Sequence, residues 1–252
     1  MKRCIKSFLP LLLILGAIQN AAADTQKSED DWNFSFAPLF LWGMGIDGST
    51  SIGPLTAPLD IKFGDALSNL DAVLTFHFEA QKSDLTLFAE YQYVDLTPSS
   101  KLPDGSEVNV GFKNTMAELG VAYRVAQYQN TNLEILGGAR YVKQELDVKG
   151  IPLPPLSSLS NKEDWWDAIV GGRMKVGIND RWSFVGRADY GFGGSDGTWN
   201  LVGFFDYRFR DWGSVFFGYK WMDFDYESGS GIDRYTYDAT QQGPLAGLNI
   251  FW

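Results

Sequence analysis

Cysteine and histidine are almost absent from this chain. Among its 252 residues, Cys4 is the one cysteine and His77 the one histidine. So few thiol and imidazole groups offer no disulfide framework and no metal site built from cysteine or histidine. A Ser–His–Asp catalytic arrangement would have to use His77, so the sequence contains little material for hydrolytic catalysis.

An apolar run long enough to cross a bilayer as a helix is missing as well. The apolar stretch at residues 8–18 is shorter than the about 20 residues that a membrane helix needs. It follows three basic residues and precedes three alanines, which is the pattern of a secretory signal peptide. We predict that residues 1–23 are a signal peptide cleaved near Ala23 and that residues 24–252 form one domain. A retained N-terminal anchor is the alternative, and the short run disfavours it.

Basic residues are outnumbered by acidic ones, 21 to 31, which gives a formal net charge of −10. The predicted signal peptide contains three basic residues and no acidic one, so its removal changes the charge from −10 to −13. A nucleic-acid-binding surface needs clustered lysine and arginine. We therefore expect no nucleic-acid partner. Cys4 would leave with the signal peptide, so the remaining chain would have no thiol.

Aromatic residues are abundant, and they lie in short stretches where apolar and polar residues alternate. Alternation with a period of two is typical of strands that have one apolar face. Pro38 interrupts the first stretch, and Pro244 predicts a bulge or break in the last. We predict ten strands, at residues 32–42, 71–80, 84–94, 108–125, 132–147, 164–178, 182–192, 198–209, 213–226 and 235–252.

The connections between these strands alternate between short turns and longer loops. This asymmetry is typical of a barrel in an outer membrane, with short periplasmic turns and longer external loops. The predicted fold class is therefore all-β, a transmembrane antiparallel up-and-down β-barrel of 10 strands, with 8 or 12 strands as alternatives. Within the first long connection, residues 59–70 indicate either a short amphipathic helix or an extended strand with a turn. Residues 151–160 predict an extended, exposed loop.

Charged residues of opposite sign recur six positions apart on the less apolar face of three successive strands. The pairs are Glu118 with Arg124, Glu134 with Arg140, and Asp167 with Arg173. In the first hairpin, Glu118 would then face Arg140, and Arg124 would face Glu134. In the second, Arg140 would face Asp167, and Glu134 would face Arg173. Because an unpaired buried charge is costly, this pattern predicts a ladder of ion pairs and a candidate constriction inside the barrel.

Further charged residues lie on the predicted inward face of other strands. These lumen candidates are His77, Glu79, Glu90, Lys175, Arg187, Asp189, Asp206, Arg208 and Lys220. A charged interior with an apolar exterior is the reverse of a soluble ligand-binding barrel and suits a bilayer. The acidic stretch at 223–233 lacks the spacing of a calcium hand, so we expect a solvated rim, no metal and no cofactor.

The chain ends on an alternating strand, PLAGLNIFW at residues 244–252, which stops at Trp252. In this ending it resembles the bacterial outer-membrane β-barrel superfamily, whose chains typically end on Phe or Trp. Residues 59–81 are similar to a segment of poorly characterised, porin-like proteobacterial barrel proteins. The resemblance implies a place in the cell outer membrane, among outer-membrane lipids and lipopolysaccharide. It also implies that Trp252 lies in an aromatic girdle and is a signal for the barrel-assembly machinery.

A barrel of about ten strands is narrow, because side chains already fill the interior at about eight. We therefore expect a narrow or gated channel for small solutes with a charge-paired lumen. The alternative is a non-conducting barrel that binds partners through its extracellular loops. The third hypothesis is an enzyme, and we expect no enzymatic activity, because His77 lacks a positioned nucleophile. Ten-stranded outer-membrane proteases resemble this chain in strand count, but they use an Asp-x-His pair that it does not contain.

Overall fold

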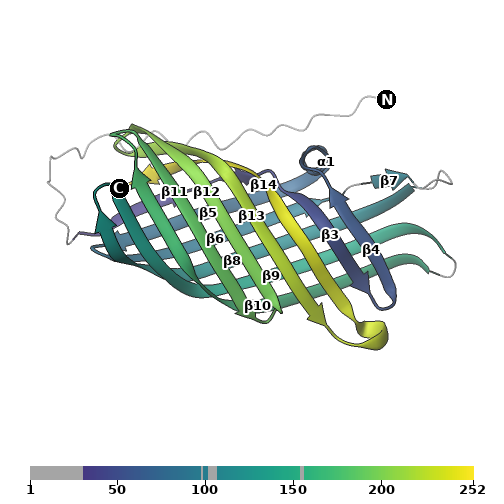
Figure 1. Ribbon diagram of the computed structural model, residues 1–252. Coiled ribbons are helices and arrows are strands. Elements are labelled where there is room, and N and C mark those ends of the chain that lie inside the picture. The colour runs from purple at the N-terminus through teal and green to yellow at the C-terminus, as the bar shows by residue number, and fades with distance from the viewer. Residues whose placement is uncertain (1–30, 98, 102–106, 154–155) are drawn as a thin grey trace, which may run out of the picture.

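A computed structural model describes residues 31–97, 99–101, 107–153 and 156–252. It confirms the predicted fold class: an all-β chain forming a closed antiparallel barrel of ten strands (Figure 1). The predicted signal peptide at residues 1–23 lies outside the described residues. The elements are β1 (Asn33–Ala37), β2 (Phe40–Trp42), β3 (Gly45–Ile52), β4 (Leu55–Ile61), α1 (Phe63–Ser68), β5 (Leu70–Lys82), β6 (Leu85–Leu96), β7 (Ser99–Lys101), β8 (Glu107–Tyr128), β9 (Thr131–Leu153), β10 (Leu156–Gly177), β11 (Trp182–Gly193), β12 (Gly197–Arg210), β13 (Gly213–Ser228), η1 (Gly231–Asp233) and β14 (Tyr235–Phe251).

The barrel closes where β14 pairs with β1, β2 and β3 in turn, so these three form one interrupted strand. Four steps from Phe36 to Phe40 lie opposite three steps on β14, which places a bulge beside Pro38. The predicted break at Pro244 is wrong, because β14 continues through it. The gap lies on the neighbouring strand, between β2 and β3, because proline has no N–H to donate there. Instead, the Gly43 N–H donates to the Pro244 carbonyl oxygen at 2.7 Å.

The connections at the two ends of the barrel differ in length, as the sequence predicts. The hairpins β5–β6, β8–β9, β10–β11 and β12–β13 turn tightly at the end that holds the C-terminus (Figure 1). At the other end β8, β9 and β10 extend to 22, 23 and 22 residues. A tilted strand needs only about 9–11 residues to cross a bilayer, so these strands project well beyond it. We call this projecting end the extracellular extension.

Two loops of the sequence prediction are more regular than expected. Residues 151–160 were expected to be a loop, but β9 and β10 continue to residue 153 and from residue 156, because the hairpin keeps pairing beyond the membrane. Residues 59–70 combine both predicted alternatives, since β4 ends at Ile61 and α1 follows over Phe63–Ser68. The β3–β4 hairpin and α1 lie at the extracellular extension (Figure 1).

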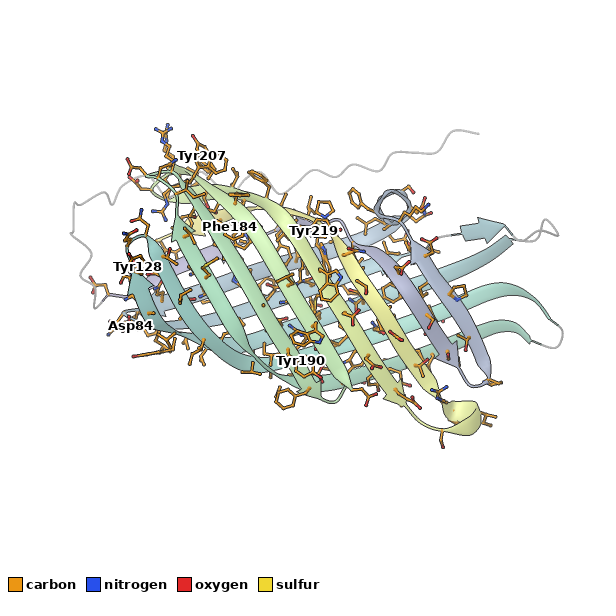
Figure 2. The ribbon with its side chains drawn as sticks, viewed as in Figure 1. Asp84, Tyr128, Phe184, Tyr190, Tyr207 and Tyr219 are labelled. Carbon is orange, nitrogen blue, oxygen red and sulfur yellow. The ribbon has the colours of Figure 1, made fainter. Side chains whose placement is uncertain are left out.

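The outer wall is apolar, which confirms the predicted facing of the strands. Leu119 is 63% exposed, Ile135 58%, Trp166 59% and Trp199 53%. Such a surface requires an apolar surrounding, which a bilayer supplies. Figure 2 places Tyr128 and Tyr207 at the short-turn end. Tyrosine is one of the residue types that are enriched at a membrane–water interface. Within the described residues, no helix is both long and apolar enough to span a membrane.

The interior differs from the prediction in one respect. We expected a polar and charged inside throughout, but most of the inward charges line the half toward the short turns. In the other half the inward face packs an apolar layer, whose central members are Met116, Val142, Trp165, Met222, Phe224 and Tyr237. The reason is that the extracellular extension stands in water and must bury apolar side chains inside, as a soluble barrel does.

Candidate functional site in the barrel lumen

The predicted register of the charge ladder is confirmed. Glu118 is paired with Arg140, and Arg124 with Glu134, across β8 and β9. Across β9 and β10, Arg140 is paired with Asp167, and Glu134 with Arg173. Side chains, however, reach past their direct neighbours, so the ion pairs are only partly those that the register suggests.

Arg140 is the centre of the layer of charges that lies nearer the extracellular extension. Its Nε donates to Glu118 at 2.8 Å, and its Nη2 donates to Asp189 at 2.6 Å. The third donor, Nη1, reaches the Thr198 hydroxyl at 3.0 Å. Arg187 joins the same two carboxylates, each at 2.7 Å. Two arginines and two acids therefore form a closed ring across the lumen, and Arg140 at its centre is 0% exposed.

Two predicted pairs are wrong. Arg124 does not pair with Glu134 but with Asp84, at 2.5 Å, where both side chains are partly exposed. Figure 2 shows Asp84 at the short-turn end, in a turn position that has no periodic signal. Asp167 makes no ion pair with Arg140 in the described part of the chain. It accepts hydrogen bonds from the backbone N–H groups of Gly194 and Ser195, at 3.1 and 2.8 Å, and so fixes the β11–β12 turn.

A second layer of charges lies nearer the short turns. Arg173 bridges Glu134, at 2.5 Å, and Glu79. Glu79 also contacts Lys175 at 3.3 Å and His77 at 3.2 Å. The same acid is therefore shared by three nitrogen-bearing side chains.

His77 and Glu90 link the second layer to β13. The His77 Nδ1 lies 3.0 Å from Glu90, which in turn contacts Lys220 at 3.1 Å. Nearer the mouth, Asp206 accepts a hydrogen bond from Ser214 at 2.6 Å, and the Arg208 guanidinium lies 4.7 Å from the ring centre of Phe251. In the described chain, no three His, Cys, Asp or Glu side chains gather as a metal site would require.

Between the ring around Arg140 and the short turns, the lumen is a cavity of about 690 Å³. Residues at its mouth come from the short-turn end: Asn33, Asp211, Asn249 and Trp252. Its inner end is lined by His77, Glu90, Arg187, Asn200 and Lys220. Every further lumen candidate named from the sequence except Asp189, which lies behind Arg187, lines this cavity. We call it the lower cavity.

On the other side of the ring, toward the extracellular extension, the apolar layer fills the barrel. Trp165 stacks on Tyr226 with ring centres 4.0 Å apart, and Phe224 packs edge-on against Tyr237 at 5.9 Å. Met222 and Phe224 are both 0% exposed. The ring and the apolar layer therefore close the lumen twice in succession.

Comparison with solved structures fits this geometry. The outer membrane protease OmpT of Escherichia coli superposes with a TM-score of 0.57 at 8% identity, covering 91% of this chain and 99% of that one. The chain has the fold of a bacterial outer-membrane β-barrel protein. That fold supports an outer-membrane location.

Other outer-membrane barrels superpose less closely. The attachment invasion locus protein Ail of Yersinia pestis matches with a TM-score of 0.36 at 8% identity, covering 88% of this chain and 97% of that one. A Pseudomonas aeruginosa FadL homologue matches with a TM-score of 0.31 at 10% identity, covering 88% of this chain and 89% of that one. No family model matches the sequence, and neither does any curated protein. At these identities the likeness is one of fold, so the function of the barrel has to be argued from its own residues.

Sequence reasoning missed two features of this barrel lumen. One is the role of Asp84, which lies in a turn. The other is the apolar layer, for which a signal exists: after Lys220 the facing of β13 reverses, with Met222, Phe224 and Tyr226 inside and Asp223, Asp225 and Glu227 outside. Apolar side chains inside and acids outside are the pattern of a barrel strand in water, and this reversal marks where the lumen is packed.

Proposed function

We propose that this protein is a non-conducting outer-membrane barrel that acts through its extracellular extension. The observation that supports this is the double closure of the lumen, by the ring around Arg140 and by the apolar layer above it. Opening such a path would require several buried charges and aromatic rings to move together, and buried ion pairs and packed cores resist that.

The extracellular extension carries an acidic surface that favours a cationic partner. Asp225 on β13 lies directly opposite Asp238 on β14, and both point outward. Like charges in direct cross-strand opposition are destabilising, so this pair lowers stability where folding alone would favour a neutral pair. Partial burial and the nearby carboxylates, including Asp196, raise the pKa of Asp225 above its ordinary value. A cationic segment of a partner would relieve this repulsion.

The test is binding of oligolysine to the refolded protein in lipid nanodiscs. The variant Asp225→Asn/Asp238→Asn should bind several-fold more weakly than the parent, and binding should weaken with salt. Asp180→Asn/Asp211→Asn removes two exposed acids from the opposite, short-turn end and is the matched control. Equal loss of binding in both double variants would reduce the effect to net charge and contradict the proposal.

A gated channel is the second candidate. The lower cavity favours it, because half of the lumen is already open to small solutes. Polar atoms left without a partner among the described residues also favour it: Asn114 Oδ1, Gln144 Nε2 and Gln241 Oε1 lie within the second closure. Buried groups of this kind accept water at small cost, so a hydrated open state is chemically reasonable. Ion conductance separates the two candidates.

We also propose that the barrel is not an enzyme and that Trp252 is its assembly signal. His77 is held between Glu79 and Glu90, an arrangement of two acids around a base that contacts no nucleophile among the described residues. Trp252 is 53% exposed at the end of the closing strand, and its ring stacks on Phe34 at 5.6 Å. An aromatic side chain there is positioned for an assembly factor that reads the last strand. Lipopolysaccharide and the barrel-assembly machinery stay predicted partners.

A further inference from the structure

The lower cavity has two walls of opposite chemistry. One wall comes from the first strand and from β12, β13 and β14, and it carries an apolar patch: Phe40, Phe216 and Leu245 lie in one buried cluster, and Phe204 packs against them. Asp206, Arg208 and Lys220 line the cavity around this patch. The other wall comes from β5, β10 and β11 and presents His77, Glu79, Arg173, Lys175 and Arg187. A lumen that served only to hold water would gain nothing from an aromatic patch on its wall.

Hydrogen-bonding capacity is left over on the charged wall. Arg173 is only 8% exposed, and its Nη2 has no partner among the described residues, although its Nε and Nη1 are both engaged. Lys175 shares Glu79 with two other side chains and has one hydrogen bond, at 3.3 Å, for its three N–H donors. Leaving a buried donor unsatisfied costs about 1–3 kcal/mol. The wall therefore has spare donors but no spare carboxylate to meet them.

We propose that the lower cavity binds a small amphiphile with a carboxylate head. The head accepts hydrogen bonds from Arg173 Nη2 and Lys175, and the apolar body packs against Phe204 and Phe216. The cavity volume of about 690 Å³ lies within the range of small-molecule sites, about 300–1,000 Å³. The mouth opens at the short-turn end, so the ligand enters from the periplasmic side.

Charge and shape both select this class of ligand. A bare inorganic anion would leave the aromatic wall in contact with water, and a neutral hydrocarbon would leave the spare donors unpaired. Only a molecule with both parts satisfies the two walls together. Asn200, whose Oδ1 is also without a partner in the described chain and lines the cavity, suits a hydroxyl or amide on the same ligand.

The experiment uses the refolded protein in lipid nanodiscs and calorimetric titration with 3-phenylpropionate. Empty nanodiscs give the partitioning baseline. The acid should bind saturably, while 3-phenylpropan-1-ol, which lacks the charge, and propionate, which lacks the ring, should each bind at least about fivefold more weakly. Equal binding of the acid and the alcohol, or no saturable binding of the acid at millimolar concentrations, would overturn the proposal.

Variants locate the site. Lys175→Gln should weaken 3-phenylpropionate binding about fivefold, because it removes one charge-assisted donor from the wall. Lys82→Gln removes a lysine that is exposed at the β5–β6 turn, and it should leave binding unchanged. If both variants bind alike, the ligand lies elsewhere and the proposal is wrong. Binding is measured independently of ion flow and of oligolysine, so it can fail while the proposed function holds, and the reverse.

Discussion

Replacing Arg140 with methionine tests the ring that closes the lumen. Methionine keeps an unbranched apolar stem but removes the donors to Glu118, Asp189 and Thr198. Removing one partner of a buried ion pair costs about 3–5 kcal/mol, because the remaining charge is left uncompensated. Here Arg187 still contacts both carboxylates at 2.7 Å, so we expect the lower end, about 3 kcal/mol.

The assay is equilibrium unfolding in urea of protein refolded in detergent micelles, followed by tryptophan fluorescence and checked by heat-modifiable gel migration. Arg124→Met is the matched control, because Arg124 pairs with Asp84 where both are partly exposed, and such pairs contribute about 0–1 kcal/mol. A third variant, Arg140→Met/Asp189→Asn, removes the one carboxylate in excess and leaves Arg187 paired with Glu118. It should recover part of the loss.

The result that refutes this reasoning is specific. If Arg140→Met and Arg124→Met lower the unfolding free energy equally, burial of the ring contributes nothing. If Arg140→Met/Asp189→Asn loses as much as the sum of the two single substitutions, the cost is one of packing and not of uncompensated charge.

Three further predictions concern the seam, the acidic surface and the last residue. Gly243→Ala places a methyl group against the backbone of the neighbouring strand where the barrel closes, so it should lower the free energy of unfolding by about 1–3 kcal/mol in the same urea assay. Gly172→Ala, where a methyl group has room, should not lower it, and equal losses in the two variants would contradict the close approach. Asp225→Asn should stabilise the protein at neutral pH, because the raised pKa of Asp225 means that the folded state disfavours its ionised form. The gain in unfolding free energy should shrink as the pH falls through the titration of Asp225, and a gain independent of pH would argue against repulsion. Deleting Trp252 should lower the yield of heat-modifiable barrel in cells more than it lowers refolding in detergent, and equal losses would make the residue structural only.

The strands and the central registers were predictable because two independent patterns agree. Alternation gives the facing of β8, β9 and β10, and the signs of the inward charges then fix how these strands align. A shift of one residue would turn every charge toward lipid, which the bilayer forbids. Glu118 opposite Arg140 follows from sequence for this reason.

The remaining contacts depend on three-dimensional stagger that a sequence does not display. Arg140 reaches Asp189 on β11, two strands away, because the barrel is narrow enough for long side chains to cross it. Arg124 turns instead toward Asp84, whose position in a turn has no periodicity. The first long connection was ambiguous because Leu59 and Phe63 fit a strand and a helix equally, and the chain uses one after the other.

The central claim is that the lumen is closed between the lower cavity and the extracellular extension. Single-channel recording of the refolded mature protein in planar bilayers tests it most directly, with heat-modifiable migration as the check that the inserted protein is folded. We predict no discrete conductance steps above those of the bilayer alone across moderate voltages. Reproducible steps from folded protein would contradict the account and establish a channel whose filter is the ring around Arg140.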